Sequence, residues 1–441
     1  MEQRQRVTRR AFVTAGMTLG VVAVGAAAVP TRVHVQGDAL QSRLDAVPSG
    51  GTLLIDSNWV RSEPLRVTRP VVIRFSEGGA IRMTTTEDAI VVTASEVSIV
   101  DPDVSGAGAD GGGLGRGVVF LGTPGAPIRS ASVIGGRLRD LPHDGVHLAY
   151  CDGFDVSRTE ITRTGYSGVL VIGGVDGVVQ DCVISDIRQP AGRVNSYGIS
   201  ISRDATQDVS ITRRSARVRV LRNRVSDVPA WEGIDTHAGD QVEIRDNVVS
   251  GCRVGIAAVP SKDPGDRTET AAAPLRLVVE GNEITKAPGA QPGPGIVVSG
   301  AGTTVGSSRE RATGTVGANT VRGGGGGADE GAILVKLSRG FVVRDNVIVD
   351  SGTAAVALPH SNDGIEVSGN TVRNVSGSGM GVNVIDGANS GAITGNRFEP
   401  SSPTLRVAVR FGPLPSAFTV RQNSYGTATV QVAPGGATIS S

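Results

Sequence analysis

The 441-residue chain has few of the residues that usually build compact enzyme cores and disulfide-stabilised domains. Aromatic residues make up 3% of it, with two Trp, and there are three Cys. This odd and small number of Cys argues against a disulfide framework. Lys occurs at only three positions, and the net charge is +1 without a long run of either sign. Binding to nucleic acid or to an anionic membrane surface is therefore not expected.

Glycine is abundant instead, at 62 residues, and the sequence repeats itself. An Asn followed by any residue and then an apolar one returns after a short alternating strand, at steps of 24 to 37 residues. These positions are Asn223, Asn247, Asn282, Asn319, Asn346, Asn370, Asn396 and Asn423. Upstream, the same place is taken by Gly136, Thr159 and Cys182. A period with a fixed minimum and longer steps predicts a solenoid with insertions.

A second short strand opens with Gly about eight residues after each of these positions, as in GVHL, GVLV, GISI and GIDT. The alternation of Asn-x-(Val/Ile) with Gly-(Ile/Val)-x-(Val/Ile) resembles the right-handed parallel β-helix repeat of the pectate-lyase-like superfamily, over about residues 50–425. The resemblance implies an inward ladder of stacked Asn, in which each amide satisfies its neighbour at a spacing of ~4.8 Å. We therefore expect an elongated all-β solenoid with coils of roughly 23–27 residues.

The first 28 residues resemble a twin-arginine signal peptide. Arg9, Arg10 and Phe12 precede a mildly apolar run that ends in small residues, and the run is short for a membrane anchor. The resemblance implies export by the twin-arginine translocase in the folded state. We expect a secreted, periplasmic or cell-wall-associated protein without stable membrane insertion after cleavage.

The rest of the chain divides into a cap at 29–49, β-helix repeats at 50–400, and a last coil with a C-terminal cap at 401–441. Leu40, Leu44 and Val47 stand at helical spacing and predict a short amphipathic helix over the first coil. Insertions into the repeat are expected at 188–196, 204–217, 260–274 and 299–314.

Chemistry is expected on outward side chains of the Gly-opened strands, because inward positions fill the core. If Val146, Val169, Ile199 and Ile234 point inward, strand alternation turns the next residue outward. The outward positions and adjoining turns then collect most ionisable and aromatic side chains, namely His143, Asp144, His147, Tyr166, Tyr197, Ser200, Trp231, Glu232, Asp235 and His237. Most later coils have Ala, Val or Leu at the equivalent places.

The segment from Trp231 to His237 carries the strongest candidate. Asp235 and His237 share one face of a strand, Glu232 enters it, and a carboxylate beside an imidazole suits general acid–base chemistry. We predict Asp235, His237, His147, Tyr197 and Glu232 as catalytic residues. The predicted substrate-binding residues are His143, Asp144, Arg163, Tyr166, Arg203 and Trp231.

The stretch containing His143 and Asp144 resembles the Pro-His-Asp motif of alginate C5-epimerases and related lyases. That resemblance implies abstraction of the C5 proton of a uronate and neutralisation of its carboxylate. His147 or His237 would serve as base, Arg163 or Arg203 as carboxylate clamp, and Tyr197 as acid. A lyase or epimerase acting on a uronate-containing polysaccharide is the preferred hypothesis.

Other functions stay open. The segment Tyr197–Ser202 resembles a polygalacturonase motif, but Tyr replaces its His and Tyr166-Ser167-Gly168 replaces its paired Asp, which disfavours that hydrolase. Inverting hydrolysis by another carboxylate pair and non-catalytic glycan binding are the alternatives. No cofactor is expected, although His143, Asp144 and His147 could ligate a metal, and loop carboxylates could bind calcium.

Overall fold

The structure is a computed structural model that describes residues 37–440, with gaps at 112, 189–194, 263–270, 288, 290, 303–309, 328–329, 376–378 and 400–404. The twin-arginine motif and the expected cleavage region fall outside these residues, so they stay predictions. Within the described part, no helix combines the length and apolar character needed to cross a membrane.

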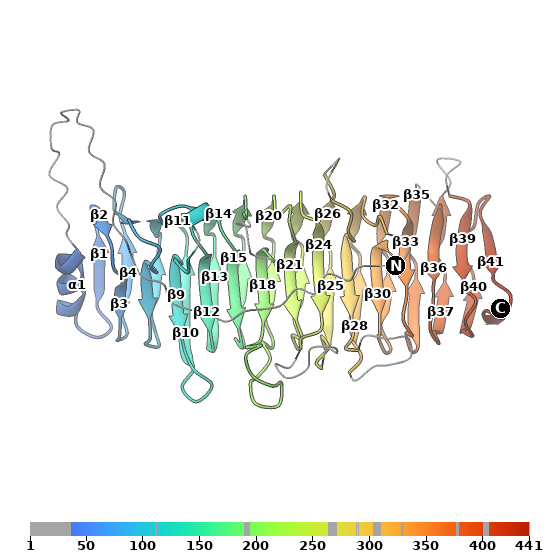
Figure 1. Ribbon diagram of the computed structural model, residues 1–441, viewed down its shortest axis with the longest axis horizontal. Helices are drawn as coiled ribbons and strands as arrows, with labels where there is room; N and C mark the ends of the chain where they lie inside the picture. Colours follow the sequence, from blue (N-terminus) through green and yellow to red (C-terminus); the bar gives the residue numbers. More distant parts are fainter. Residues whose placement is uncertain are drawn as a thin grey trace, which may run out of the picture. The chain divides into compact units, whose positions relative to one another are not determined.

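The body from Val35 onward is a parallel β-helix. Successive strands go in turn to three sheets, so each sheet takes every third strand and pairs parallel neighbours from consecutive coils (Figure 1). The 15-stranded sheet runs from β1 (Thr52–Ile55) to β42 (Thr438–Ser440), and the 13-stranded sheet from β2 (Asn58–Arg61) to β38 (Arg397–Glu399). Parallel strands of one sheet joined by crossovers wind in a right-handed sense.

The third sheet has 14 strands and contains the Gly-opened strands of the repeat. In order these are β3 (Leu65–Val67), β6 (Ile90–Val92), β9 (Val118–Leu121), β12 (Asp144–Ala149), β15 (Ser167–Ile172), β18 (Tyr197–Ser202), β21 (Glu232–His237), β24 (Val254–Val259), β27 (Ile296–Ser299), β30 (Gly331–Lys336), β33 (Ala354–Leu358), β36 (Met380–Val384), β39 (Val407–Phe411) and β41 (Thr429–Val432).

The predicted Asn ladder is confirmed as one row. From Asn223 to Asn396, each side-chain amide donates to the carboxamide oxygen of the next Asn at 2.9–3.0 Å. Cys182 occupies the preceding rung, since its backbone N–H donates to Asn223 Oδ1 at 3.0 Å. The row is almost entirely buried beside an aliphatic core of stacked Val, Ile and Leu. This satisfies the amides inside a coil that has no room for water.

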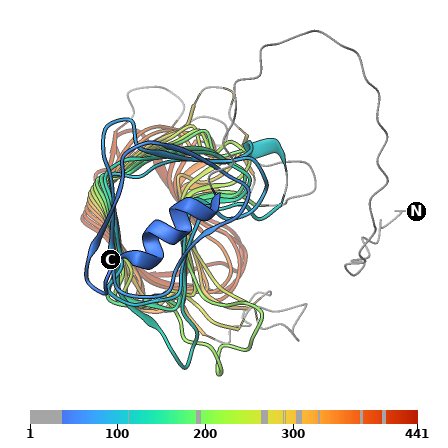
Figure 2. The ribbon, with the colours of Figure 1, turned by 90° about the vertical axis from the view of Figure 1, so that its left-hand side faces the viewer.

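The first coil is covered by α1 (Gly37–Ala46), the helix expected from the sequence. Figure 2 shows α1 lying across the open end of the coils. Leu40 and Leu44 are buried, and Arg69 donates to the carbonyls of Leu44 and Val47 at 2.6 and 2.9 Å. These bonds satisfy carbonyls at the helix C-terminus.

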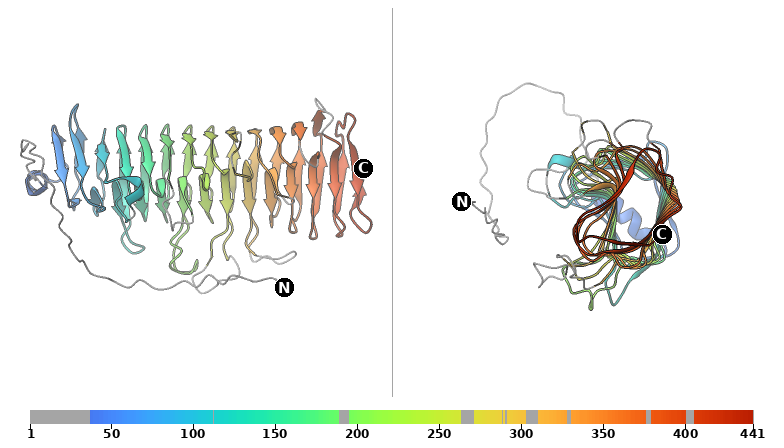
Figure 3. Two further views of the ribbon diagram at one scale, coloured as in Figure 1. Left: turned by 45° about the horizontal axis from the view of Figure 1, so that its top comes forward. Right: turned by 90° about the vertical axis from the view of Figure 1, so that its right-hand side faces the viewer.

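The connections between strands also follow the expected pattern. The segments between β18 and β19 (Arg219–Leu221), and between β24 and β25 (Leu277–Glu280), are the longer ones predicted as insertions. In Figure 3, the green loop after β18 leaves the stack of coils on the same side as the loop after β9. The three Cys, at 151, 182 and 252, are buried thiols.

Candidate functional site

The candidate site lies on four neighbouring strands of the 14-stranded sheet, β12, β15, β18 and β21. Their pairing aligns one column at the strand entrance, Asp144, Ser167, Tyr197 and Glu232, and a second one further along, His147, Leu170, Ser200 and Asp235. Between these columns, Val146, Val169, Ile199 and Ile234 join the hydrophobic core. The predicted inward and outward register is therefore confirmed.

The outward side chains are more enclosed than strand alternation alone suggests. Asp235 is 0% exposed and Glu232 is 6% exposed, whereas the side chain of His237 is 30% exposed. The centre is thus buried at its carboxylates and reaches solvent at its imidazole.

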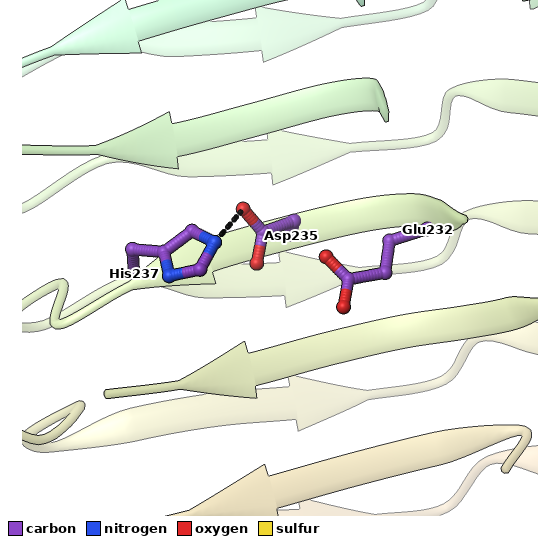
Figure 4. Close-up of side chains that lie close together, drawn as sticks. All are labelled: Glu232, Asp235 and His237. Atoms are coloured by element: carbon purple, nitrogen blue, oxygen red, sulfur yellow. Dashed lines mark ion pairs between the residues drawn. The ribbon is translucent and has the colours of Figure 1, made fainter. Parts of the chain in front are cut away.

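Glu232, Asp235 and His237 come together as one cluster on β21 (Figure 4). One ligand atom from each lies within 4.8 Å of the others. His237 Nε2 is 3.4 Å from Asp235 Oδ2, which also accepts a 2.9 Å hydrogen bond from Ser200 Oγ. Among the described residues, Glu232 Oε2 and Asp235 Oδ1 are buried without a hydrogen-bond partner. Two carboxylates in this position need a proton or a cation between them.

The electrostatics of the cluster follow from that burial. Burial, reinforced for Glu232 by the nearby Asp235, raises the pKa of both carboxyl groups to about 8. Burial also lowers the pKa of His237, against the charge of Glu232 and a hydrogen bond to the Pro260 backbone. The imidazole is thus kept neutral and able to accept a proton or bind a metal.

A second cluster surrounds Asp144 on β12. Its Oδ2 is 2.8 Å from His147 Nδ1, its Oδ1 is 2.9 Å from His143 Nδ1, and Ser167 Oγ donates to Oδ1 at 2.5 Å. Burial opposes ionisation, but the two histidines outweigh it and hold the pKa of Asp144 well below its usual range. Both carboxylate oxygens are already engaged, so this cluster is closed and the metal site considered from the sequence lacks a free ligand set here.

A row of rings joins the two clusters. Tyr166 lies 4.6 Å from His143 and 5.6 Å from Tyr197, and Tyr197 lies 6.3 Å from His237, measured between ring centroids. Asn195 Nδ2 donates to the Tyr197 hydroxyl at 2.9 Å. Burial, and then the charge of Asp235, raise the pKa of Tyr197 far above its ordinary value. This makes Tyr197 a poor proton donor, contrary to the acid role expected for it.

The two predicted carboxylate clamps are engaged elsewhere. Arg163, on β14 (Glu160–Thr164) of the 13-stranded sheet, forms a two-bond ion pair with Asp140 at 2.6 and 3.0 Å. Arg203 is 2% exposed and braces the loops after β18 and β24 through bonds to Ser261 Oγ and the Lys262 carbonyl. Neither guanidinium is placed to hold a substrate carboxylate.

Sequence reasoning missed Arg253. Its guanidinium carbon lies 4.9 Å from the Trp231 ring centroid, and it stands one residue before Val254, the register partner of Glu232. Its charge acts on Glu232 and lowers the pKa of that carboxyl. The repeat itself held the signal, because Arg253 follows Trp231 at the same place one coil later.

Comparison with known proteins agrees with this architecture. Residues 117–265 match the family described as right handed beta helix region, and residues 194–408 match the periplasmic copper-binding protein NosD family. A tailspike protein double mutant of E. coli bacteriophage HK620, solved with a pentasaccharide, superposes with a TM-score of 0.56 at 12% identity, covering 92% of this chain and 76% of that one. The catalytic unit of an α-1,3-glucanase from Streptomyces thermodiastaticus gives 0.51 at 15%, covering 94% and 67%. No curated protein matches. The fold is a right-handed parallel β-helix.

Proposed function

We propose that this protein is an exported enzyme that acts on polysaccharide, with Glu232, Asp235 and His237 as its reactive centre. The observation that carries the proposal is the pair of buried carboxylates with unpartnered oxygens beside a half-exposed imidazole. Such groups are costly to bury and are typical of functional sites. The oligosaccharide bound to a tailspike and the glucanase activity of another protein of this fold support a glycan as the substrate class.

The finer proposal is a lyase or epimerase acting on a uronate-containing glycan. This chemistry needs a base for the C5 proton and a cation for the uronate carboxylate. The centre on β21 supplies the base, and Arg253 supplies the cation in place of Arg163 and Arg203. Inverting hydrolysis instead requires two carboxyl groups ~6.5–9.5 Å apart. Glu232 and Asp235 offer ligand oxygens within 4.8 Å, which favours a single proton-transfer centre.

A panel of uronate-containing and neutral polysaccharides tests this proposal. Products are followed by the ultraviolet absorbance of unsaturated sugar, by reducing ends, and by NMR for epimerised residues. Unsaturated or epimerised product supports the finer proposal, reducing ends alone indicate a hydrolase, and binding without product indicates a glycan-binding protein.

Variants then locate the chemistry on the substrate that the panel identifies. We expect Asp235→Asn and Glu232→Gln to lower kcat by ~10²–10⁴-fold, and Arg253→Gln mainly to raise KM. His360→Gln is the matched control, because His360 Nδ1 also faces a carboxylate, Asp386 Oδ2 at 3.1 Å, on a later coil. Full activity in both carboxyl variants would place the reaction elsewhere.

Export is supported by the paired Arg9 and Arg10 and by the match to a family described as periplasmic. Changing both arginines to Lys should retain the protein in the cytoplasm, as measured by fractionation against the unchanged chain. Continued export of the variant would indicate the general secretory route.

A further inference from the structure

We propose that the cluster of Glu232, Asp235 and His237 binds a divalent transition-metal ion of the zinc class. One oxygen of each carboxylate and a ring nitrogen of His237 would be the protein ligands. In the described part of the chain, these three residues form a group whose ligand atoms all lie within 4.8 Å of one another.

The unpartnered oxygens are the independent sign of a missing ligand. Asp235 Oδ1 and Glu232 Oε2 are both buried and have no hydrogen-bond partner among the described residues. A buried carboxylate oxygen ordinarily has at least one donor, since leaving it unpaired is costly. Two such atoms facing one cluster are accounted for by a single cation.

The ligand spacing suits a small ion after a slight contraction. Zn²⁺ binds carboxylate oxygen at ~2.0–2.2 Å and imidazole nitrogen at ~2.0–2.1 Å, so its ligand atoms stand about 3–4 Å apart. The side chains need to close by only a fraction of their present separation. Calcium prefers six to eight oxygen ligands, which two carboxylates and an imidazole do not provide.

The residues around the cluster fix these ligands in the way that metal sites require. Ser200 Oγ donates to Asp235 Oδ2 and leaves Oδ1 for the ion, and the ring of His237 is hydrogen-bonded to the Pro260 backbone. Such outer contacts orient carboxylate and histidine ligands. The exposed edge of His237 leaves one side of the site open to solvent. Three protein ligands and an open position are the arrangement of catalytic zinc sites.

The Asp144 cluster provides the internal contrast. It also combines a buried carboxylate with imidazole rings, yet Asp144 has an oxygen in contact with each histidine and a bond from Ser167. Its carboxylate is compensated by groups of the protein itself. The same residue types therefore form a closed cluster on β12 and an open one on β21.

Isothermal titration with ZnCl₂ tests the inference on the full-length protein, after EDTA treatment and removal of the chelator. We expect one site per chain. Asp235→Asn and Glu232→Gln, which keep side-chain shape, should each weaken binding by at least ~10–100-fold, the loss typical for outer-shell changes alone. His147→Gln and His360→Gln should bind as the unchanged chain does. Circular dichroism of each variant verifies its fold.

A measurement on the unchanged chain makes the test independent of the variants. Co²⁺ added in place of Zn²⁺ should give visible absorption bands of a low-coordinate site, and Zn²⁺ should displace it. Absence of binding, or equal affinity in both carboxyl variants, would overturn the inference and leave a shared proton between the carboxylates. The inference shares its site with the proposed function but not its test: Zn²⁺ binding without any glycan product would refute only the function, and product formation without Zn²⁺ binding only the metal site.

Discussion

The replacement Asp235→Asn should make the metal-free protein more stable at neutral and alkaline pH while removing its function. Asp235 is 0% exposed, and burial raises its pKa from 3.8 to about 8, partly offset by the bonds from Ser200 and Glu232. Between these two pH values the folded state therefore binds more protons than the unfolded state. Stability falls as the pH rises through this window, by ~1.4 kcal/mol per pH unit for one group. At pH 7 the penalty is roughly 4 kcal/mol as an upper estimate.

Asn at this position carries no charge, its oxygen can accept the Ser200 bond, and its amide can donate to Glu232. Thermal and urea unfolding in EDTA, followed by circular dichroism at pH 4, 6 and 8, measures the effect. The gain of the variant over the unchanged chain should be near zero at pH 4 and increase toward pH 8. Added Zn²⁺ should stabilise only the unchanged chain. Equal or lower stability of the variant at pH 8 in EDTA would refute the claim that an uncompensated carboxylate is buried here.

Three further predictions concern the fold. Asn319→Ala should cost about 3–6 kcal/mol in the free energy of unfolding, because it leaves the Asn282 amides and the Val279 carbonyl unpaired; Asn423→Ala, at the half-buried end of the ladder, should cost clearly less. Ile234→Asp should lower the melting temperature strongly, because a charge enters the core; no change would contradict the register. For Asp144→Asn, urea unfolding should show a loss of stability at pH 7 that shrinks below about pH 4, since a depressed carboxyl pKa stabilises only above the unfolded value; a loss independent of pH would exclude this origin.

The fold could be predicted from the sequence because its determinants are local and repeated. A rung of the ladder needs one Asn per coil, and each Asn bonds to the next. The same repetition gives the strand register, so the inward position of Ile234 and the outward position of Asp235 follow from counting. The enclosure of Asp235 does not follow in this way, since it depends on contacts outside the repeat.

Arginine roles were beyond the same reasoning. Arg163 and Arg203 carry the charge that a uronate clamp requires, but their partners are set by tertiary contacts across separate coils and loops. Asp140 precedes Arg163 by one coil, and Ser261 belongs to an inserted loop 58 residues after Arg203. A long side chain selects among such partners only once the coils are stacked. Arg253, in contrast, stands in the column of Trp231 and could be found by alignment of the coils.

The placement of chemistry on β21 follows from a steric requirement of the core. A Cβ on the glycine that opens each site strand would lie 2.4–2.8 Å from the backbone oxygen of the next such glycine, closer than real side chains approach. This holds for Gly145, Gly168, Gly198 and Gly233. Because the glycine column fixes where each strand begins, it also fixes the residue before it and the second residue after it as outward positions. Evolution can therefore exchange Asp144 for Glu232, or His147 for Asp235, from coil to coil without disturbing the stacked core, and the four site coils carry ionisable groups where later coils carry Ala or Leu.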